Sequence, residues 1–442
     1  PLRRQRQMCI RDRSYSSIIK TGYGKCDDRT ALVTMALRSV GIPAAFEFVP
    51  YWGSNNNGHS FVSIILPDNK IYPLQNTDKQ ANGDYYLSRK TPKIYRKMYS
   101  IQDLAKHIDN IPELFRHNDL LDVTKLHNIG SCDVTVSTNI NKEKENFLSV
   151  FSPKRWVPVA FSSSQTFHHI GTGNIYNVDR NKEAIDLGDG IVYLPTHWVN
   201  EEDIPIGSPI IVSEDSVREI KPDTKHLERV VCKRKFPLNM RIVDFSKLMI
   251  MGVFEGANKA DFSDATELYK ITKTPESKMQ KIEISAEKAY RYIRYRKPKG
   301  TFSIAEFCLY QSDEKLLPFH PIACDAIYED STMLNIFDGQ PLTYYQVSGG
   351  IDLWVGVDLY KPVKISKIGF APRNDDNAIV STDTYELFYW QDQWISLGRK
   401  RPIGDSVVYD NVPQKALLWL RNLTKGREER PFTYENGKQI WW

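Results

Sequence analysis

A cysteine and a histidine near the start of the chain have the types and the order that nucleophilic thiol chemistry requires. Cys26 opens a stretch of helical pattern, in which apolar residues recur at helical spacing until Gly41 and Pro43 end the helix. At a helix N-terminus, unpaired backbone N–H groups and the helix dipole favour negative charge, which stabilises a thiolate. His59 follows later in the chain and would hold the thiol proton.

Two strands are needed to position this histidine. The run 44–51 has strand character, 53–58 is a polar turn, and 61–66 predicts a second strand that begins just after His59. We therefore expect His59 at the edge of a strand that follows the helix of Cys26.

Four short blocks of this region match one known family. They are Gly24-Lys25-Cys26-Asp27, Ala36-Leu37-Arg38, Gly41-Ile42-Pro43-Ala44 and His59-Ser60-Phe61. On these blocks, the chain from about residue 15 to 105 resembles the transglutaminase-like superfamily, in which a Cys opens a helix, a His lies on the next strand and an Asp lies one strand later. The resemblance implies a papain-like transglutaminase core, of which residues 14–108 would form the C-terminal part.

The third member of the superfamily's triad does not match in this chain. The pattern would put an Asp about where Gln75 stands. A neutral amide, from Gln75 or Asn76, can still orient an imidazole by accepting its N–H, and Asp78 is the other candidate. The catalytic candidates are therefore Cys26, His59, Gln75 and Asp78.

The resemblance implies nucleophilic attack on a carboxamide. The Cys26 thiolate would attack the carbonyl carbon, His59 would protonate the departing amine, and a thioester would form before water or a second amine resolves it. Hydrolysis and amide transfer share this thioester, so both stay open. Each residue alone is more often an ordinary core or surface side chain. The alternative is therefore a non-catalytic cell-surface protein that binds carbohydrate or protein and has a degenerate transglutaminase-like core.

Residues 1–13 differ in character from the rest of the chain. They resemble translated sequencing-adapter read-through, and we exclude them from the fold prediction as an artefact. They carry five arginines against Asp12, so the formal net charge of +5 falls to about +1 for the remainder. The competing interpretation is a basic arm for nucleic acid or an anionic membrane, which would need a basic cluster that continues into the fold. We predict no nucleic-acid partner and a signal sequence that is missing from this fragment.

The composition predicts several globular domains. A chain of 442 residues is long enough for three or four of them. It contains no run of about 18 apolar residues, so we predict no membrane span in this fragment. Its cysteines are scattered without a CxxC motif, which argues against a disulfide framework and a metal site. We predict no metal and no cofactor.

Short strand patterns separated by Gly, Asn and Asp turns fill the rest of the chain. Residues 113–220 predict an Ig-like β-sandwich that acts as a spacer. Two further segments, 227–311 and 317–442, contain the blocks Tyr290-Arg291-Tyr292-Ile293-Arg294-Tyr295, Asp338-Gly339 and Trp354-Val355-Gly356-Val357-Asp358-Leu359. On these blocks, each segment resembles the discoidin, or coagulation factor 5/8 C-type, family, which has a galactose-binding-like jelly-roll fold.

The discoidin resemblance implies glycan binding through aromatic faces and polar loop residues. The candidate ligand-binding residues are Tyr344, Tyr345, Arg373 and Asn374. The terminal Asn436-Gly437 turn and the aromatic strand after it suggest that the last sheet closes there.

The predicted fold class is therefore a multidomain α+β and all-β protein, with a papain-like transglutaminase core fragment, an Ig-like β-sandwich and two β jelly rolls. The predicted function is that of a bacterial, extracytoplasmic thiol enzyme of the periplasm or cell surface. It would hydrolyse or transfer amide bonds of a peptide or glycoprotein substrate, as a cysteine protease or amidase does. The discoidin-like modules would bind a glycan or a surface.

Overall fold

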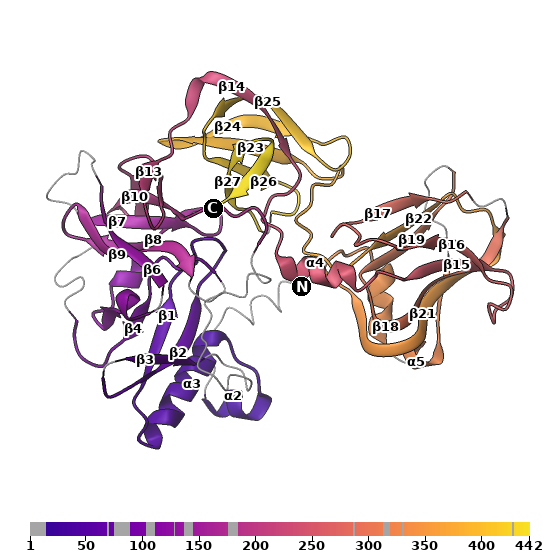
Figure 1. Ribbon diagram of the computed structural model, residues 1–442, viewed down its shortest axis with the longest axis horizontal. Helices are drawn as coiled ribbons and strands as arrows, with labels where there is room; N and C mark the ends of the chain where they lie inside the picture. The colour runs from indigo at the N-terminus through magenta and orange to yellow at the C-terminus, as the bar shows by residue number, and fades with distance from the viewer. Residues whose placement is uncertain are drawn as a thin grey trace. The chain divides into compact units, whose positions relative to one another are not determined.

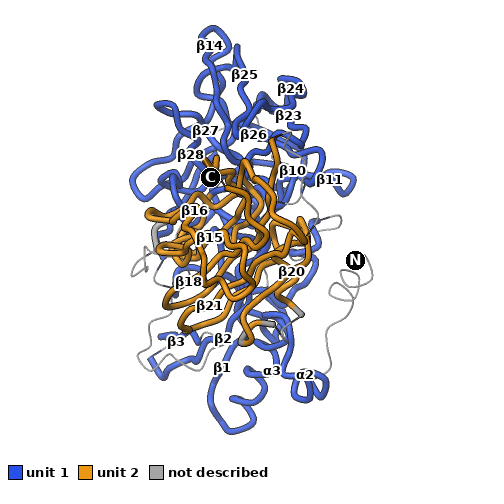
Figure 2. Tube along the Cα trace, turned by 90° about the vertical axis from the view of Figure 1, so that its right-hand side faces the viewer, with its two compact units in different colours: residues 1–237, 379–442 blue, residues 238–378 orange. Residues whose placement is uncertain are grey.

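The computed structural model divides into two compact units, and each is described by itself (Figure 2). Unit 1 comprises residues 1–237 and 379–442, and unit 2 comprises residues 238–378. The structure describes residues 15–442 except 69, 75–88, 103–110, 128, 137–144, 176–183, 286–287, 313–318, 329–330 and 427.

The N-terminal part of unit 1 is an antiparallel sheet with a helix packed against two of its strands. Its elements are α2 (Tyr15–Thr21), α3 (Cys26–Ser39), β1 (Ala44–Val49), β2 (His59–Ile65), β3 (Ile71–Leu74), β4 (Tyr95–Lys97) and β5 (Leu120–Asp122). The strand order is β3-β2-β1-β4-β5, and α3 contacts β1 and β2 (Figure 1). The predicted succession of a helix and two strands is confirmed. The sheet continues to Asp122, beyond the boundary that we expected at residue 108.

The end of α3 follows from its local sequence. Gly41 has a φ of 82°, which suits glycine because it has no Cβ, and its N–H donates to the carbonyl oxygen of Arg38. The Arg38 Nε donates to the carbonyl oxygen of Ala44 over 2.6 Å. This bond fixes the angle at which β1 leaves the helix.

Two sheets with a common apolar core follow in the sequence. Their elements are η1 (Glu113–Phe115), η2 (Thr124–Leu126), β6 (Ile129–Thr135), β7 (Asn146–Phe151), β8 (Trp156–Ser162), β9 (Thr166–Ile175), β10 (Ile191–Val199), β11 (Glu202–Pro205), β12 (Ile210–Val212) and β13 (Val217–Glu219). The larger sheet has the order β13-β12-β10-β7-β8 with β11 beside β10, and β6 pairs with β9 in the smaller one. Val134 and Ile170 of the smaller sheet pack with Leu148 and Tyr193 of the larger one.

The last strands of the chain return to unit 1. They are β23 (Tyr385–Gln391), β24 (Gln393–Lys400), β25 (Val407–Gln414), β26 (Leu418–Asn422), β27 (Pro431–Glu435) and β28 (Lys438–Trp441), and β14 (Asp223–Cys232) pairs with β25. Tryptophans join this sheet to β8. Trp394 stacks on Trp156 with an interplanar angle of 6°, and its ring centroid lies 5.0 Å from that of Trp390.

One buried arginine joins three parts of unit 1. Arg430 is 2% exposed, and its guanidinium donates to the carbonyl oxygens of Gly53, Asn55, Phe151 and Trp442. Burial lowers the pKa of Arg430 to about 9, so the side chain still carries its charge at neutral pH. Four backbone dipoles hold this charge, and they belong to the turn before β2, to β7 and to the end of the chain.

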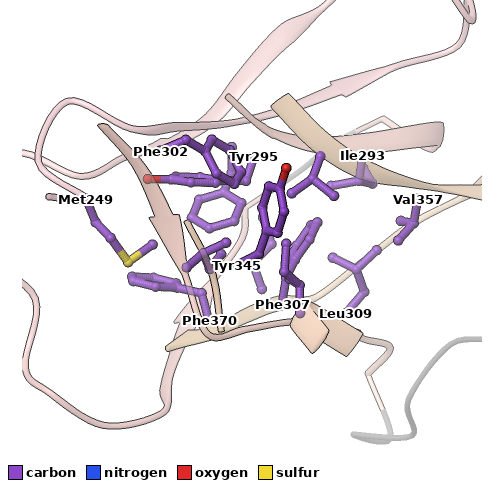
Figure 3. Packing of buried hydrophobic residues seen from close by; sticks show 14 of the residues in the cluster. Met249, Ile293, Tyr295, Phe302, Phe307, Leu309, Tyr345, Val357 and Phe370 are labelled. Carbon is purple, nitrogen blue, oxygen red and sulfur yellow. The ribbon is translucent and has the colours of Figure 1, made fainter. Parts of the chain in front are cut away.

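Unit 2 consists of two antiparallel sheets with a few short helices. Its elements are α4 (Met240–Lys247), β15 (Val253–Ala257), β16 (Thr266–Lys270), β17 (Gln280–Glu283), β18 (Tyr290–Ile304), β19 (Glu306–Tyr310), β20 (His320–Ala323), α5 (Asp325–Tyr328), η4 (Ser331–Phe337), β21 (Tyr345–Val363) and β22 (Lys367–Ala371). The sheet orders are β16-β15-β18-β21-β20 and β17-β22-β19. Tyr295 of the first sheet packs in one core with Phe307 and Phe370 of the second (Figure 3).

The strand pairing corrects the two tandem jelly rolls that we predicted over 227–311 and 317–442. β18 pairs with β21 along its length, with Tyr295 opposite Val355, so unit 2 crosses the expected boundary between the two modules. β14 and β25 pair in unit 1 although the whole of unit 2 lies between them in the sequence. Unit 2 is therefore an insertion. The mostly β character of the chain is confirmed, and none of the described helices is long and apolar enough to cross a membrane.

Candidate active site

Cys26 is the first residue of α3, as predicted, and it is half-buried. Its Sγ lies 3.9 Å from Oδ1 of Asp27 and donates a weak hydrogen bond to this carboxylate. Asp28 accepts a bond of 2.9 Å from the backbone N–H of Lys25. The positive end of the helix dipole therefore acts on the carboxylates of Asp27 and Asp28 as well as on the thiol of Cys26.

His59 is the first residue of β2 and pairs with Val49 of β1. Its ring stacks on Trp52 at a centroid distance of 6.1 Å and on Phe61 at 6.3 Å. Burial lowers the pKa of His59, the positive charge of Arg89 lowers it further, and Asp27 opposes both effects. The ring is therefore neutral near pH 7, which is the form that accepts a proton.

A hydrogen bond joins the two residues that follow Cys26 and His59 in the sequence. Ser60 Oγ donates to Oδ1 of Asp27, which joins the N-terminus of α3 to the start of β2. Successive side chains of a strand point to opposite faces. Because Ser60 faces α3, the ring of His59 lies on the other face, with Phe61.

The structure thus places Cys26 and His59 at adjoining ends of α3 and β2 without a direct bond between them. In the described part of the chain, the thiol donates to Asp27 and not to the imidazole. A closed Cys-His pair needs a rearrangement at the first residue of β2.

Behind Phe61 lies a buried polar cluster that our sequence analysis missed. Glu47 of β1 is 0% exposed and accepts hydrogen bonds from Arg96 Nε over 2.8 Å and from Ser63 Oγ over 2.5 Å. Its Oε2 lies 2.8 Å from Nε2 of His127. Burial acts to raise the pKa of Glu47, but His127, Ser63 and Arg96 outweigh it and hold the pKa below its ordinary value. The one sequence signal was a carboxylate inside the apolar run of β1.

This cluster has a structural role. Glu47 has its hydrogen-bonding partners on β2, on β4 and at His127, which follows η2, and the rings of His127 and Phe61 meet edge to face with their centroids 5.5 Å apart. It therefore fixes the position of Phe61, which in turn contacts the ring of His59. Glu47 therefore acts on the position of the His59 ring through the packing of His127 and Phe61.

Two of the predicted catalytic residues, Gln75 and Asp78, lie outside the described residues. β3 ends at Leu74, which is opposite Val62 of β2. The third member of the site stays a prediction.

The four ligand-binding candidates lie in unit 2 in different environments. Tyr345 is 4% exposed and packs on Phe302 in the core, so its ring face is covered. Asn374 is 8% exposed and donates to the carbonyl oxygens of Pro341 and Pro372. Arg373 and Tyr344 are partly exposed and contact each other. Among the described side chains, no group of three or more His, Cys, Asp or Glu could hold a metal ion.

Comparison with known proteins supports the assignment of the N-terminal region. The model of the transglutaminase-like superfamily matches residues 9–75. No curated protein and no solved structure matches the chain. The matched stretch begins inside the segment 1–13 that we excluded, contains both Cys26 and His59, and ends at Gln75. Over residues 9–75, this chain is thus similar to the transglutaminase-like superfamily.

Proposed function

We propose that the chain is a thiol enzyme of the transglutaminase-like type, which cleaves or transfers carboxamide bonds with Cys26 as nucleophile. One observation carries this proposal. Within the matched stretch, a thiol opens α3, and the adjacent Asp27 is bonded to Ser60, the residue that follows a neutral histidine. Nucleophile and base are thus placed on two elements that a hydrogen bond ties together.

The proposed reaction proceeds in two steps. Nε2 or Nδ1 of His59 takes the thiol proton as Sγ attacks the carbonyl carbon, and the imidazolium then returns this proton to the leaving nitrogen as the C–N bond breaks. The product on the enzyme is a thioester. Water or a second amine attacks the thioester and gives up a proton to His59, the C–S bond breaks to release the acid or the new amide, and His59 returns the proton to Sγ of Cys26. The backbone N–H of Cys26, the first residue of α3, would donate to the oxyanion.

The neutral state of His59 favours a particular form of this mechanism. Because burial and the charge of Arg89 lower the pKa of His59, its imidazole is neutral near pH 7 and can accept the thiol proton. Proton transfer then accompanies attack on the substrate. The first residue of β2 must first rearrange, so that the His59 ring leaves Trp52 and reaches the face of the sheet on which α3 lies.

A second function is favoured by the absence of a bond between the thiol and the imidazole in the described chain. The domain would then bind a peptide or glycan at a surface without turnover. The extracytoplasmic location, the peptide or glycoprotein substrate and the glycan-binding role of unit 2 belong to the same set of proposals.

The test uses the full chain and a panel of peptides that contain glutamine or asparagine carboxamides. We expect mass spectrometry to detect an acyl group on Cys26 and an assay to detect released ammonia. Both should be absent in Cys26→Ser and reduced by about 100-fold or more in His59→Ala. His117→Ala is the matched control, because His117 is exposed and lies outside the site.

Alkylation by iodoacetamide gives a readout that needs no substrate. If His59 accepts the thiol proton, His59→Ala slows the alkylation of Cys26 and leaves that of Cys324 unchanged. Equal alkylation rates of Cys26 in both proteins, with no acylation by any peptide, would refute the enzyme and favour the binding protein.

A further inference from the structure

The guanidinium of Arg373 in unit 2 lies between two aromatic rings. Its central carbon is 3.8 Å from the ring centroid of Phe245 in α4 and 3.9 Å from that of Tyr344. Both faces of the planar group are therefore covered, in contacts that combine cation–π attraction and stacking. The edges, which carry the N–H donors, are not used by these contacts.

A second arginine shares the same aromatic ring. The guanidinium carbon of Arg241 lies 5.5 Å from the centroid of Phe245. Two positive charges thus lie within 5.5 Å of the centre of one aromatic ring. Burial lowers the pKa of Arg373, Tyr344 opposes this effect, and the like charge of Arg241 lowers the pKa further.

These two arginines differ from the others in unit 2. Arg291 forms a two-bond pair with Asp358, and both Arg294 and Arg296 bond to Glu255. In the described residues, by contrast, the side chains of Arg373 and Arg241 have neither a hydrogen-bond acceptor nor an ion-pair partner. The unpaired arginines of the unit are therefore the two that meet at Phe245.

The loop that carries Arg373 is held in place by its neighbour. Asn374 donates to the carbonyl oxygens of Pro341 and Pro372, and its own Oδ1 accepts a bond of 2.9 Å from the N–H of Asp376. Asp375 accepts a bond of 3.3 Å from the N–H of Asn377. The side chains of Asn374 and Asp375 thus hold the loop through bonds to backbone groups, and no ion pair joins Arg373 to an acidic side chain among the described residues.

We propose that Arg373, together with Arg241, binds an oxyanion of a small acidic ligand, namely the carboxylate of an acidic sugar or a sulfate group. A guanidinium whose faces are blocked still offers two parallel N–H donors along an edge, and this fork fits the two oxygens of an oxyanion. The stacked rings restrict its rotation, so little further freedom is lost on binding. The anion would neutralise two charges that lie near each other without a counterion. This site is independent of the chemistry of Cys26.

The ligand class distinguishes this site from one for neutral sugars. A neutral hexose offers only hydroxyl groups, which do not offset the two positive charges. Glucuronate and glucose differ at one carbon, so a comparison of the two isolates the carboxylate. Inorganic sulfate tests the other source of an oxyanion.

The experiment is calorimetric titration of the full chain with glucuronate, glucose and sulfate at low ionic strength. We expect glucuronate or sulfate to bind with a Kd of about 1 mM or below and glucose to show no heat of binding. Arg373→Gln should weaken anion binding by at least about tenfold, and Arg241→Gln by less. Arg373→Lys keeps the charge but lacks the fork, and should also weaken binding. Arg229→Gln, in unit 1, makes the same change in net charge and should have no effect.

Two results would overturn the proposal. One is that the wild-type protein binds neither anion, or binds glucose with the same affinity as glucuronate. The other is Arg373→Gln or Arg373→Lys protein that retains wild-type affinity. Thermal unfolding of each variant shows that unit 2 is folded, and Arg373→Lys, which keeps a cation between the rings, remains informative if Arg373→Gln does not fold.

Discussion

The buried carboxyl group of Glu306 predicts that unit 2 becomes less stable as the pH rises through the neutral range. Glu306 is the first residue of β19, is 4% exposed, and its Oε1 has no hydrogen-bond partner among the described residues. Burial raises the pKa of Glu306 to about 7, and the nearby carboxylate of Asp338 adds to this effect. Backbone N–H groups of Gly339 and Gln340 oppose it in part.

The sign and size of the effect follow from this pKa. The ordinary value of 4.5 applies to the unfolded chain, so between pH 4.5 and about 7 the folded state binds more protons than the unfolded state. The stabilisation is complete below pH 4.5 and is lost as the pH rises towards 7. At about 1.4 kcal/mol for each tenfold difference in proton affinity, the total is about 3 kcal/mol.

The assay is denaturant-dependent hydrogen exchange of the full chain, read by mass spectrometry on peptides of β18 and β19. The free energy of unfolding of wild-type unit 2 should fall by about 3 kcal/mol, relative to that of Glu306→Gln, from pH 4.5 to pH 7.5. Glu267→Gln is the matched control, since Glu267 is exposed on β16. Parallel pH profiles for the wild type and Glu306→Gln would refute the reasoning, because the carboxyl group would then titrate as it does in water.

Three further predictions concern unit 1. Asp27→Asn should lower the pKa of His59 further, because Asp27 is the group that raises it, and an NMR titration of labelled histidines would show the lower midpoint; an unchanged midpoint contradicts this. Glu47→Gln removes the carboxylate that pairs with the buried guanidinium of Arg96 and should cost roughly 3 to 5 kcal/mol in urea unfolding. Arg430→Ala removes the bonds to four carbonyl oxygens and should cost a similar roughly 3 to 5 kcal/mol. Tryptophan fluorescence follows the unfolding of unit 1 in both variants, since every tryptophan of the sequence except Trp354 lies in that unit. A decrease in the free energy of unfolding of less than about 1 kcal/mol would contradict either prediction.

Local patterns predicted the elements around the site better than they predicted their partners. Helical spacing after Cys26 and the stop at Gly41 placed α3 correctly, and alternation placed β1 and β2 within two residues. These signals act over a few residues, so the sequence contains them in full. The local sequence does not show which residues bond to Glu47. Arg96 and His127 lie on other elements, and no pattern around either residue marks it as a partner.

The division into domains failed for the same physical reason. The alternation of β18 and of β21 shows that each is a strand with one buried face, but alternation does not say which strand lies beside which. Two similar patterns in succession therefore suggested a repeat. Contacts across the two sheets, such as that of Phe254 with Phe370, select the actual pairing, and they arise only when the whole unit packs.

Arg430 also has a consequence for the order in which the protein matures on the ribosome. Its guanidinium closes on the carbonyl oxygen of Gly53, which precedes it by 377 residues, in the turn that leads to His59. At roughly 5 to 20 residues per second, this contact forms some 20 to 75 s after Gly53 has been synthesised. Until then, the turn before the histidine lacks a bond that fixes it. The nascent chain therefore completes the surroundings of His59 only after residue 430 has been synthesised.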